Sequence, residues 1–343
     1  MKIKFLNLCI ILLISSCSKV ETINLKKHKY NQNPGRIVWM QIAGLSEEHL
    51  ALLRFSRPAV ELGSAFEESH CFGKMWNFNL YDLRPDSSRG FLSQIYGTKN
   101  ITDQCRDYEN VPMWSFFKKL GYKVGVLESG AKDNQSIVKA WKCADDNTQL
   151  DKITTLWKMS DSSNKNAKRF HFQEKIPFVE GNIYYDKSCK GGICYASLFN
   201  NATKIYENTK SSAIRSMLVI RDFNLEEAVD RKDIESLQNQ LREIEKTYNY
   251  FVAESKRDPN LLVVMSGSGT RNIELPSGGR QWEEFDKKGR FVLYKKNSLM
   301  SPVFARGPRS ENFCGLYEES SIFKRFLWSS KDSNSPLDLL GLQ

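Results

Sequence analysis

Five short runs of nearly continuous apolar residues are spread along the chain, and each has the length of a β-strand. They cover residues 36–42, 122–127, 217–220, 261–265 and 302–305. Continuous apolar runs are typical of strands that are covered on both faces of a sheet. Helical patterns lie between these runs. Strands that alternate with helices predict an α/β fold: a mostly parallel central sheet with helices on both faces.

The longest helical pattern lies between the third and fourth runs. Its apolar residues are spaced alternately three and four apart: Ile234, Leu237, Leu241, Ile244, Tyr248 and Phe251. This spacing places them on one side of a helix, which we expect to pack in the core rather than against a partner. Shorter helices are predicted after Ser46, from about Asp86 to Gly97, and from Pro112 to Gly121.

The middle of the chain, about residues 130–215, is less regular. We interpret it as an insertion or cap region within a single domain that covers residues 36–343. It has two predicted helices, near 134–143 and 196–207, and an alternating segment at 170–172 that predicts a strand. His171 in that segment is interpreted as structural.

The N-terminus has the pattern of a bacterial lipoprotein signal. Lys2 and Lys4 precede a short apolar run at 6–14, and Ser15 and Ser16 come directly before Cys17. We expect cleavage before Cys17, acylation of Cys17 with palmitate or a similar chain, and a lipidated tether over residues 17–35. An ordinary secretory signal with a chance cysteine is the alternative. Residues 1–16 would be removed with the signal.

These features predict a location outside the cytoplasm. No later apolar run has the roughly 18 residues that a membrane-spanning helix needs, so the lipid is the expected attachment to the membrane. The protein would face the periplasm or the cell surface. Ser18 stands where an aspartate often retains lipoproteins at the inner membrane, which favours the outer membrane.

The charge and the cysteines further limit the partners and the kinds of site that we expect. The formal net charge is +10, but the basic residues are dispersed and no nucleic-acid-binding motif occurs, so no nucleic-acid partner is expected. Beyond Cys9 and Cys17, six cysteines remain, which suggests disulfides in an oxidising compartment. Cys189 and Cys194 are the favoured pair because they are close in sequence. A zinc site is the alternative, but no C-x2-C pair or suitably spaced histidine supports it.

The order of elements resembles the alkaline phosphatase/sulfatase superfamily over about residues 36–310. In that family the first strand ends in Asp-Gly, a Ser, Thr or Cys nucleophile begins a helix, and a helix leads into Gly-Tyr and a strand. A later strand ends in Ser-Asp-His-Gly, and the strand that follows it ends near Gly-Pro. The matching stretches here are Ile42-Ala43-Gly44-Leu45, Pro85-Asp86-Ser87-Ser88-Arg89, Leu120-Gly121-Tyr122, Met265-Ser266-Gly267-Ser268-Gly269 and Arg306-Gly307-Pro308.

The departures from this pattern concern metal ligands. The resemblance implies a metal centre that activates the nucleophile, and such a centre needs several carboxylate or imidazole ligands. Ala43 replaces the aspartate of the first strand, and Gly267 and Ser268 replace the Asp-His pair. Glu128 and Asp222 are the acids that directly follow predicted strands. Two scattered carboxylates cannot build a two-metal site, so we expect no metal and no other cofactor.

Ser87, Ser88 and Arg89 are the weak catalytic candidates, together with Asp222. Backbone N–H groups at the start of their helix could hold an anion, and Arg89 could add a charge-assisted contact. A capping serine explains the same residues without any ligand. The segment 266–269 resembles a nucleophile elbow only superficially, because Ser266 stands where Gly-x-Ser-x-Gly requires glycine.

Three hypotheses for function follow. The first is a catalytically silent domain of this superfamily, anchored to the membrane, that binds an envelope component or a partner protein. The second is a phosphate- or sulfate-ester hydrolase or transferase with a rebuilt site, in which Ser87 or Ser88 acts with Asp222 and Glu128. The third is a solute-binding lipoprotein of an unrelated α/β fold.

Overall fold

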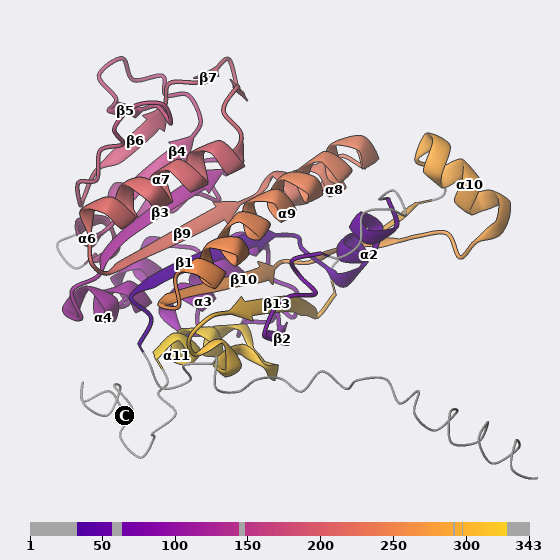
Figure 1. The fold of residues 1–343 in the computed structure, drawn as a ribbon, viewed down its shortest axis with the longest axis horizontal. Coiled ribbons are helices and arrows are strands. Elements are labelled where there is room, and N and C mark those ends of the chain that lie inside the picture. Colours follow the sequence, from indigo (N-terminus) through magenta and orange to yellow (C-terminus); the bar gives the residue numbers. More distant parts are fainter. Residues whose placement is uncertain (1–32, 57–63, 144–147, 291, 297, 328–343) are drawn as a thin grey trace, which may run out of the picture.

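The structure is a computed structural model that describes residues 33–56, 64–143, 148–290, 292–296 and 298–327 (Figure 1). The predicted signal, Cys17 and most of the predicted tether lie outside the described residues. No helix in these ranges is both long enough and apolar enough to cross a membrane.

A large central sheet organises the described residues, and it is mostly parallel. Strand β13 is antiparallel to both of its neighbours, and all other neighbours are parallel. The order across the sheet is β14 (Gly315–Glu318), β2 (Cys71–Trp76), β13 (Met300–Arg306), β10 (Leu261–Ser268), β1 (Arg36–Ala43), β9 (Ser216–Asp222), β3 (Lys123–Ser129), β4 (Thr155–Met159), β6 (Ile183–Asp186) and β5 (Arg169–Phe170).

The five apolar runs fall on strands β1, β3, β9, β10 and β13, as the pattern predicted. Strand β1 lies between β9 and β10, and every residue after Arg36 in it is buried. Its side chains alternate between two cores: Val38 packs on one face of the sheet, and Trp39 packs on the other. A strand with both faces covered in this way has no position that must be polar, which explains the continuous run.

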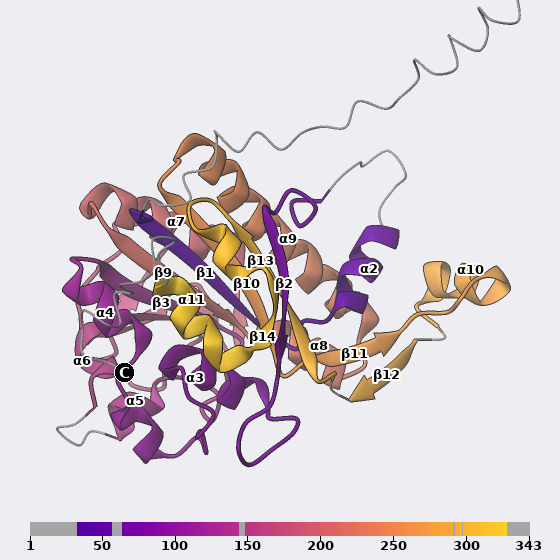
Figure 2. The same ribbon diagram turned by 90° about the horizontal axis from the view of Figure 1, so that it is seen from below.

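Helices cover both faces, which confirms the predicted fold class (Figures 1 and 2). One core includes residues of α2 (Glu47–Phe55), α7 (Leu198–Ser212), α8 (Asn224–Asp230) and α9 (Ile234–Arg257). The other core includes residues of α3 (Ser87–Tyr96), α4 (Met113–Lys119), α5 (Lys139–Lys142), α6 (Leu150–Ile153) and α11 (Ile322–Leu327). Helix α4 begins after Pro112, which is its N-cap and not its first helical residue.

Helix α9 confirms the apolar stripe. Leu237, Leu241, Ile244, Tyr248 and Phe251 are all buried in the first core. Ile234, at the start of the helix, is partly buried and packs against the same core. The stripe therefore serves packing on the sheet.

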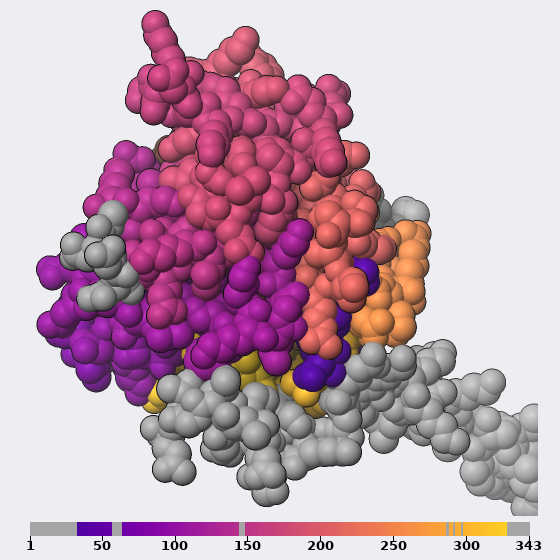
Figure 3. Space-filling model, turned by 90° about the vertical axis from the view of Figure 1, so that its left-hand side faces the viewer, coloured from indigo at the N-terminus to yellow at the C-terminus, as the bar shows by residue number. Residues whose placement is uncertain are grey.

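The middle region joins the central layer. Strands β4, β6 and β5 extend the sheet beyond β3, and helix α7 packs against α9. Figure 3 shows this part of the chain, coloured magenta to pink, over the upper part of one face. The helix predicted near 134–143 is only the short α5, and the strand predicted at 170–172 ends at Phe170, so His171 lies outside it. Both sequence patterns were too short to predict where the helix and the strand begin and end.

Three disulfides and a projecting arm complete the fold. Cys189 and Cys194 are joined across a small hairpin, β7 (Cys189–Lys190) and β8 (Ile193–Cys194). Cys71 pairs with Cys314, and Cys105 pairs with Cys143. Strands β11 (Arg271–Glu274) and β12 (Leu293–Lys296) carry helix α10 (Gly279–Lys288) away from the body (Figures 1 and 2). Short 3-10 helices are η2 (Cys105–Glu109), η3 (Ser310–Phe313) and η4 (Glu319–Ser321).

Candidate functional site

The carboxyl ends of the central parallel strands meet the start of helix α3 at one edge of the sheet. The register pairs Ala43 with Ser268, and Asp222 with both Ile42 and Ser129. The start of α3 packs directly against the end of β10, because a Cβ on Gly269 would lie 2.5 Å from the Ser87 backbone nitrogen. In open α/β sheets this edge is the usual place for ligands.

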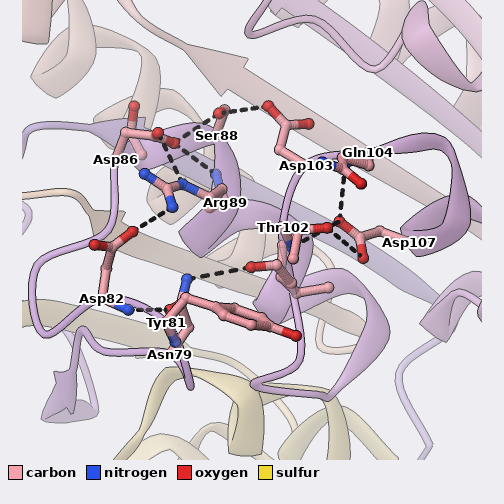
Figure 4. Close-up of polar contacts among 12 residues, drawn as sticks. Asn79, Tyr81, Asp82, Asp86, Ser88, Arg89, Thr102, Asp103, Gln104 and Asp107 are labelled. Atoms are coloured by element: carbon pink, nitrogen blue, oxygen red, sulfur yellow. Dashed lines mark hydrogen bonds and ion pairs between the residues drawn. The ribbon is translucent and has the colours of Figure 1, made fainter.

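The N-terminus of α3 is already occupied by a carboxylate of the chain itself (Figure 4). Asp86 is the N-cap, and it accepts the Arg89 backbone N–H at 2.9 Å and the Ser88 hydroxyl at 2.7 Å. Burial opposes the charge of Asp86, but the hydrogen bonds from Arg89 and Ser88 lower the pKa of its carboxyl below the usual value. Asp86 thus fills the place that a bound anion would take.

Arg89 is likewise engaged within the chain. Its Nε donates to Asp86 Oδ2 at 3.0 Å, and its guanidinium also pairs with Asp82 (Figure 4). The Asp82 loop is held by Asn79, whose side-chain oxygen accepts the backbone N–H groups of Tyr81 and Asp82. Two residues of the anion pocket that the sequence suggested, Ser88 and Arg89, are therefore bonded to Asp86 in the helix cap.

Ser87 belongs to a different, buried network. Its hydroxyl donates to Glu226 Oε2 at 2.5 Å, and Glu226 Oε1 lies 2.7 Å from Arg271 Nη2. Burial raises the pKa of the Glu226 carboxyl, although Arg271 and the Ser87 hydroxyl act in the opposite direction. A serine beside a carboxylate is the arrangement of an activated nucleophile. However, the Ser87 side chain is fully buried, so an ester cannot reach it in this conformation.

Apolar rings cover Ala43, where the resemblance implies an aspartate. Ala43, Phe91 and Phe223 form a small buried cluster, and the two rings meet edge to face with centroids 5.6 Å apart. The guanidinium of Arg221 lies 5.5 Å from the centre of Phe91 and 5.4 Å from that of Phe223. This arrangement places aromatic surface and a fixed cation beside the end of the first strand.

Glu128 and Asp222 do not form a joint site. Glu128 pairs with Arg221 at 2.6 Å, and both side chains are fully buried. Arg221 and Asp222 are adjacent in β9, so their side chains point to opposite faces of the sheet. Asp222 lies with Asn224, whose amide donates to Asp222 Oδ1 at 2.6 Å. Burial raises the pKa of Asp222 to about 6.

The positions that replace the Asp-His pair hold a further buried carboxyl. Ser268 Oγ donates to Glu319 Oε2 at 3.0 Å, and the Gly267 carbonyl accepts the Gln94 amide at 3.1 Å. Burial raises the pKa of Glu319 to about 7. Gly90 is required here, because a Cβ at that position would lie 1.8 Å from Ser268 Oγ.

The groups at this edge do not fit a metal centre. Within the described ranges, no group of three or more His, Cys, Asp or Glu side chains is arranged to hold a metal ion. The carboxylates of Glu226, Asp222 and Glu319 have separate partners, as described above. His49, which follows β1, accepts the Ser46 backbone N–H through Nδ1, and burial lowers its pKa to about 3.

Several residues of these networks were not predicted from the sequence. Glu226 is one of two acids in the first turn of α8, a placement that helix capping explains without any site. Arg271 and Glu319 follow no motif. Each meets its partner only through the fold: Ser87 and Glu226 are 139 residues apart.

Comparisons with known proteins establish the fold. No family model and no curated protein matches the chain. Among solved structures, the alkaline phosphatase of the Antarctic bacterium TAB5 matches with a TM-score of 0.63 at 14% identity, over 86% of this chain and 98% of that one. The Thermus thermophilus alkaline phosphatase matches with a TM-score of 0.63 at 10% identity, over 96% of both chains.

A third match is the lipoteichoic acid synthase LtaP from Listeria monocytogenes, with a TM-score of 0.50 at 11% identity, over 88% of this chain and 73% of that one. At such low identities the likeness shows the fold alone. The chain has the alkaline phosphatase-like α/β fold, which the resemblance implied. The unrelated α/β fold of the third hypothesis was therefore wrong.

Proposed function

We propose that this protein is a lipid-anchored, extracytoplasmic binding protein whose alkaline phosphatase-like domain does not hydrolyse esters. It would bind an envelope component or a partner protein. The observation that supports this most directly is the state of Ser87, which is buried and bonded to the Glu226–Arg271 pair. The nucleophile position thus serves to join α3 to α8.

The surroundings of Ser87 support the same proposal. Metal-assisted transfer needs ligands that converge on one point and leave a position open for the substrate. Here Ala43 is covered by Phe91 and Phe223, and Ser268 is bonded to Glu319. The hydroxyl groups of Ser87 and Ser268 are thus both used in contacts within the chain.

The location rests on the N-terminal pattern. Cys17 would carry the lipid, and the segment from Cys17 to β1 would link the domain to the membrane surface. The periplasmic side or the cell surface, with a preference for the outer membrane, remains the proposed location.

The test combines metal analysis with turnover. The mature protein would be purified without chelators, its zinc, manganese, magnesium and calcium contents measured, and its hydrolysis of phosphate monoesters, phosphate diesters and sulfate esters assayed. We expect no stoichiometric metal and the same background rate in the wild type and in Ser87→Ala. Stoichiometric metal with turnover that Ser87→Ala abolishes would refute the proposal.

One observation favours a second candidate, a metal-independent esterase or transferase. The 2.5 Å contact would let Glu226 accept the Ser87 proton as the hydroxyl oxygen attacks the phosphorus or sulfur of an ester, and Glu226 would return that proton to the departing alcohol oxygen. Water, or an acceptor alcohol in a transferase, would then release the phosphate or sulfate group from Ser87. The Arg271 guanidinium would balance the negative charge of the Glu226 carboxylate. This activity requires a rearrangement that exposes Ser87. It predicts turnover without metal that is lost in both Ser87→Ala and Glu226→Gln, whereas equal rates in all three proteins would exclude it.

A further inference from the structure

A cavity of about 660 Å³ opens at the carboxyl ends of β3 and β4, and Asn224 and Glu227 of α8 contribute to its lining. It lies within the size range of small-molecule sites. Its wall is made by four segments of the chain: residues 129–132 after β3, residues 159–161 after β4, residues 192–198 from the β7–β8 hairpin to the start of α7, and residues 224–243 on α8 and α9.

Local contacts fix two sides of this cavity. The Cys189–Cys194 disulfide closes the hairpin that supplies one wall. At the ends of β3 and β9, Asn224 donates to Ser129 Oγ at 2.7 Å and to Asp222 Oδ1 at 2.6 Å. Gly130 allows this contact, because a Cβ there would lie 2.4 Å from Asn224 Oδ1. The cavity is therefore preformed at these two walls.

The charges in the lining disfavour an anion. Three carboxylates, Asp161, Glu227 and Glu243, face one cation, Lys132. The start of α7 would attract an anion, but the chain already satisfies it. Glu243 accepts the Phe199 backbone N–H at 2.8 Å, and the Ser197 hydroxyl accepts that of Asn200 at 3.2 Å. A phosphate or sulfate would meet the Glu243 carboxylate there.

The remaining lining favours a ligand that is rich in hydroxyl groups. Asn239 and Gln240 supply amides, Ser160 supplies a hydroxyl, and the carboxylates are acceptors. None of the described residues that line the cavity is aromatic, and the larger apolar side chains among them are Met159 and Leu198, which offer little to an aromatic or lipid ligand. Neighbouring hydroxyl groups of a sugar can donate to the carboxylates and accept from the amides at the same time.

We propose that this cavity binds an uncharged saccharide unit. The proposal rests on the proposed function in one respect: it treats the domain as a binding module and specifies the chemical class of the envelope component. The site is separate from Ser87, and Asn224 and Glu227 on α8 belong to the cavity while Glu226 on the same helix holds Ser87.

The test is calorimetric titration of the purified, detergent-solubilised mature protein. The probes are N-acetylglucosamine, diacetylchitobiose, galactose and maltose, with glycerol 2-phosphate and spermidine as charged probes. Gln240→Ala removes a lining amide, and Ser160→Phe fills the cavity. Gln238→Ala on the same helix, outside the lining, is the matched control. Far-ultraviolet circular dichroism confirms that each variant is folded.

We expect at least one saccharide to bind, Gln240→Ala to weaken its binding about tenfold, equivalent to roughly 1.4 kcal/mol, and Ser160→Phe to abolish it. Gln238→Ala should bind as the wild type does. Saccharide binding that is equal in Gln240→Ala and Gln238→Ala would overturn the assignment of the cavity but leave a binding function in place. No saccharide binding, or tighter binding of glycerol 2-phosphate or spermidine, would overturn the ligand class. Ester turnover would instead count against the proposed function alone.

Discussion

The Arg221–Glu128 pair offers a quantitative test of the idea that the edge of the sheet is now a structural core. Both side chains are fully buried, and Arg221 Nη1 lies 2.6 Å from Glu128 Oε1. Glu128 also accepts the Ser136 hydroxyl at 2.5 Å and the Ile137 backbone N–H at 2.9 Å. Arg221→Met removes the cation and leaves Glu128 as an uncompensated buried charge.

Breaking a buried pair in this way costs about 3–5 kcal/mol of unfolding free energy. Adding Glu128→Gln removes the remaining charge, keeps one oxygen to accept the Ile137 backbone N–H, and offers an NH2 group that can donate to the Ser136 hydroxyl oxygen. The double variant should therefore recover roughly 2 kcal/mol or more, because replacing both partners of a buried pair is often close to neutral. Urea unfolding of the wild type, both single variants and the double variant gives the coupling between the two residues.

The control is Lys256→Met, which breaks a solvent-exposed pair with Glu68 and should leave stability almost unchanged. The reasoning is refuted if Arg221→Met costs less than about 1 kcal/mol, or if Glu128→Gln brings no recovery in the Arg221→Met background. Either result would mean that the pair is hydrated or mobile and does not close the edge of the sheet.

Three further predictions concern other parts of the molecule. Glu319 has a pKa raised to about 7 by burial, so its protonated form favours the folded state; its stabilisation is complete below about pH 4.5 and is lost as the pH rises to about 7. In Glu319→Gln, urea unfolding between these pH values should show a smaller loss of stability than in the wild type, and equal slopes would contradict the assignment. Loop-closure entropy predicts that replacing Cys71 and Cys314 by serine, 243 residues apart, costs about 5 kcal/mol, against about 2 kcal/mol for Cys189 and Cys194, 5 residues apart; thermal unfolding of both variants tests this order. Cys17→Ser should move the protein from the membrane pellet to the soluble fraction after cell lysis, and unchanged sedimentation would exclude the lipid anchor.

The central strands could be predicted because burial on both faces of the sheet produces a continuous run of apolar residues in the sequence. Strand β2 has no such apolar run, because its residues alternate between buried and more exposed positions near the side of the sheet. Strands β5 and β6 are short and partly exposed, so no regular spacing of apolar residues marked the strands of the middle region. Helix α9 could be predicted because its apolar residues keep a regular spacing over about five turns of a 24-residue helix.

The candidate site could be predicted only where the sequence departs from the pattern of the family that it resembles. Ala43 and Gly267 stand out in the sequence because the resemblance implies ligands there. The groups that lie at this edge in the structure, Phe91, Glu226 and Glu319, have ordinary local roles in their helices. Their contacts depend on tertiary packing between residues far apart in the chain, and no local pattern records such contacts.

The central claim is that the carboxyl edge of the sheet holds no metal centre. The most direct measurement is a crystal structure of the mature protein grown with zinc and magnesium. The account predicts Ser87 bonded to Glu226, Ala43 beneath Phe91 and Phe223, and no ion at this edge. An ion beside Ser87, held by three or more side chains of the protein, would contradict it.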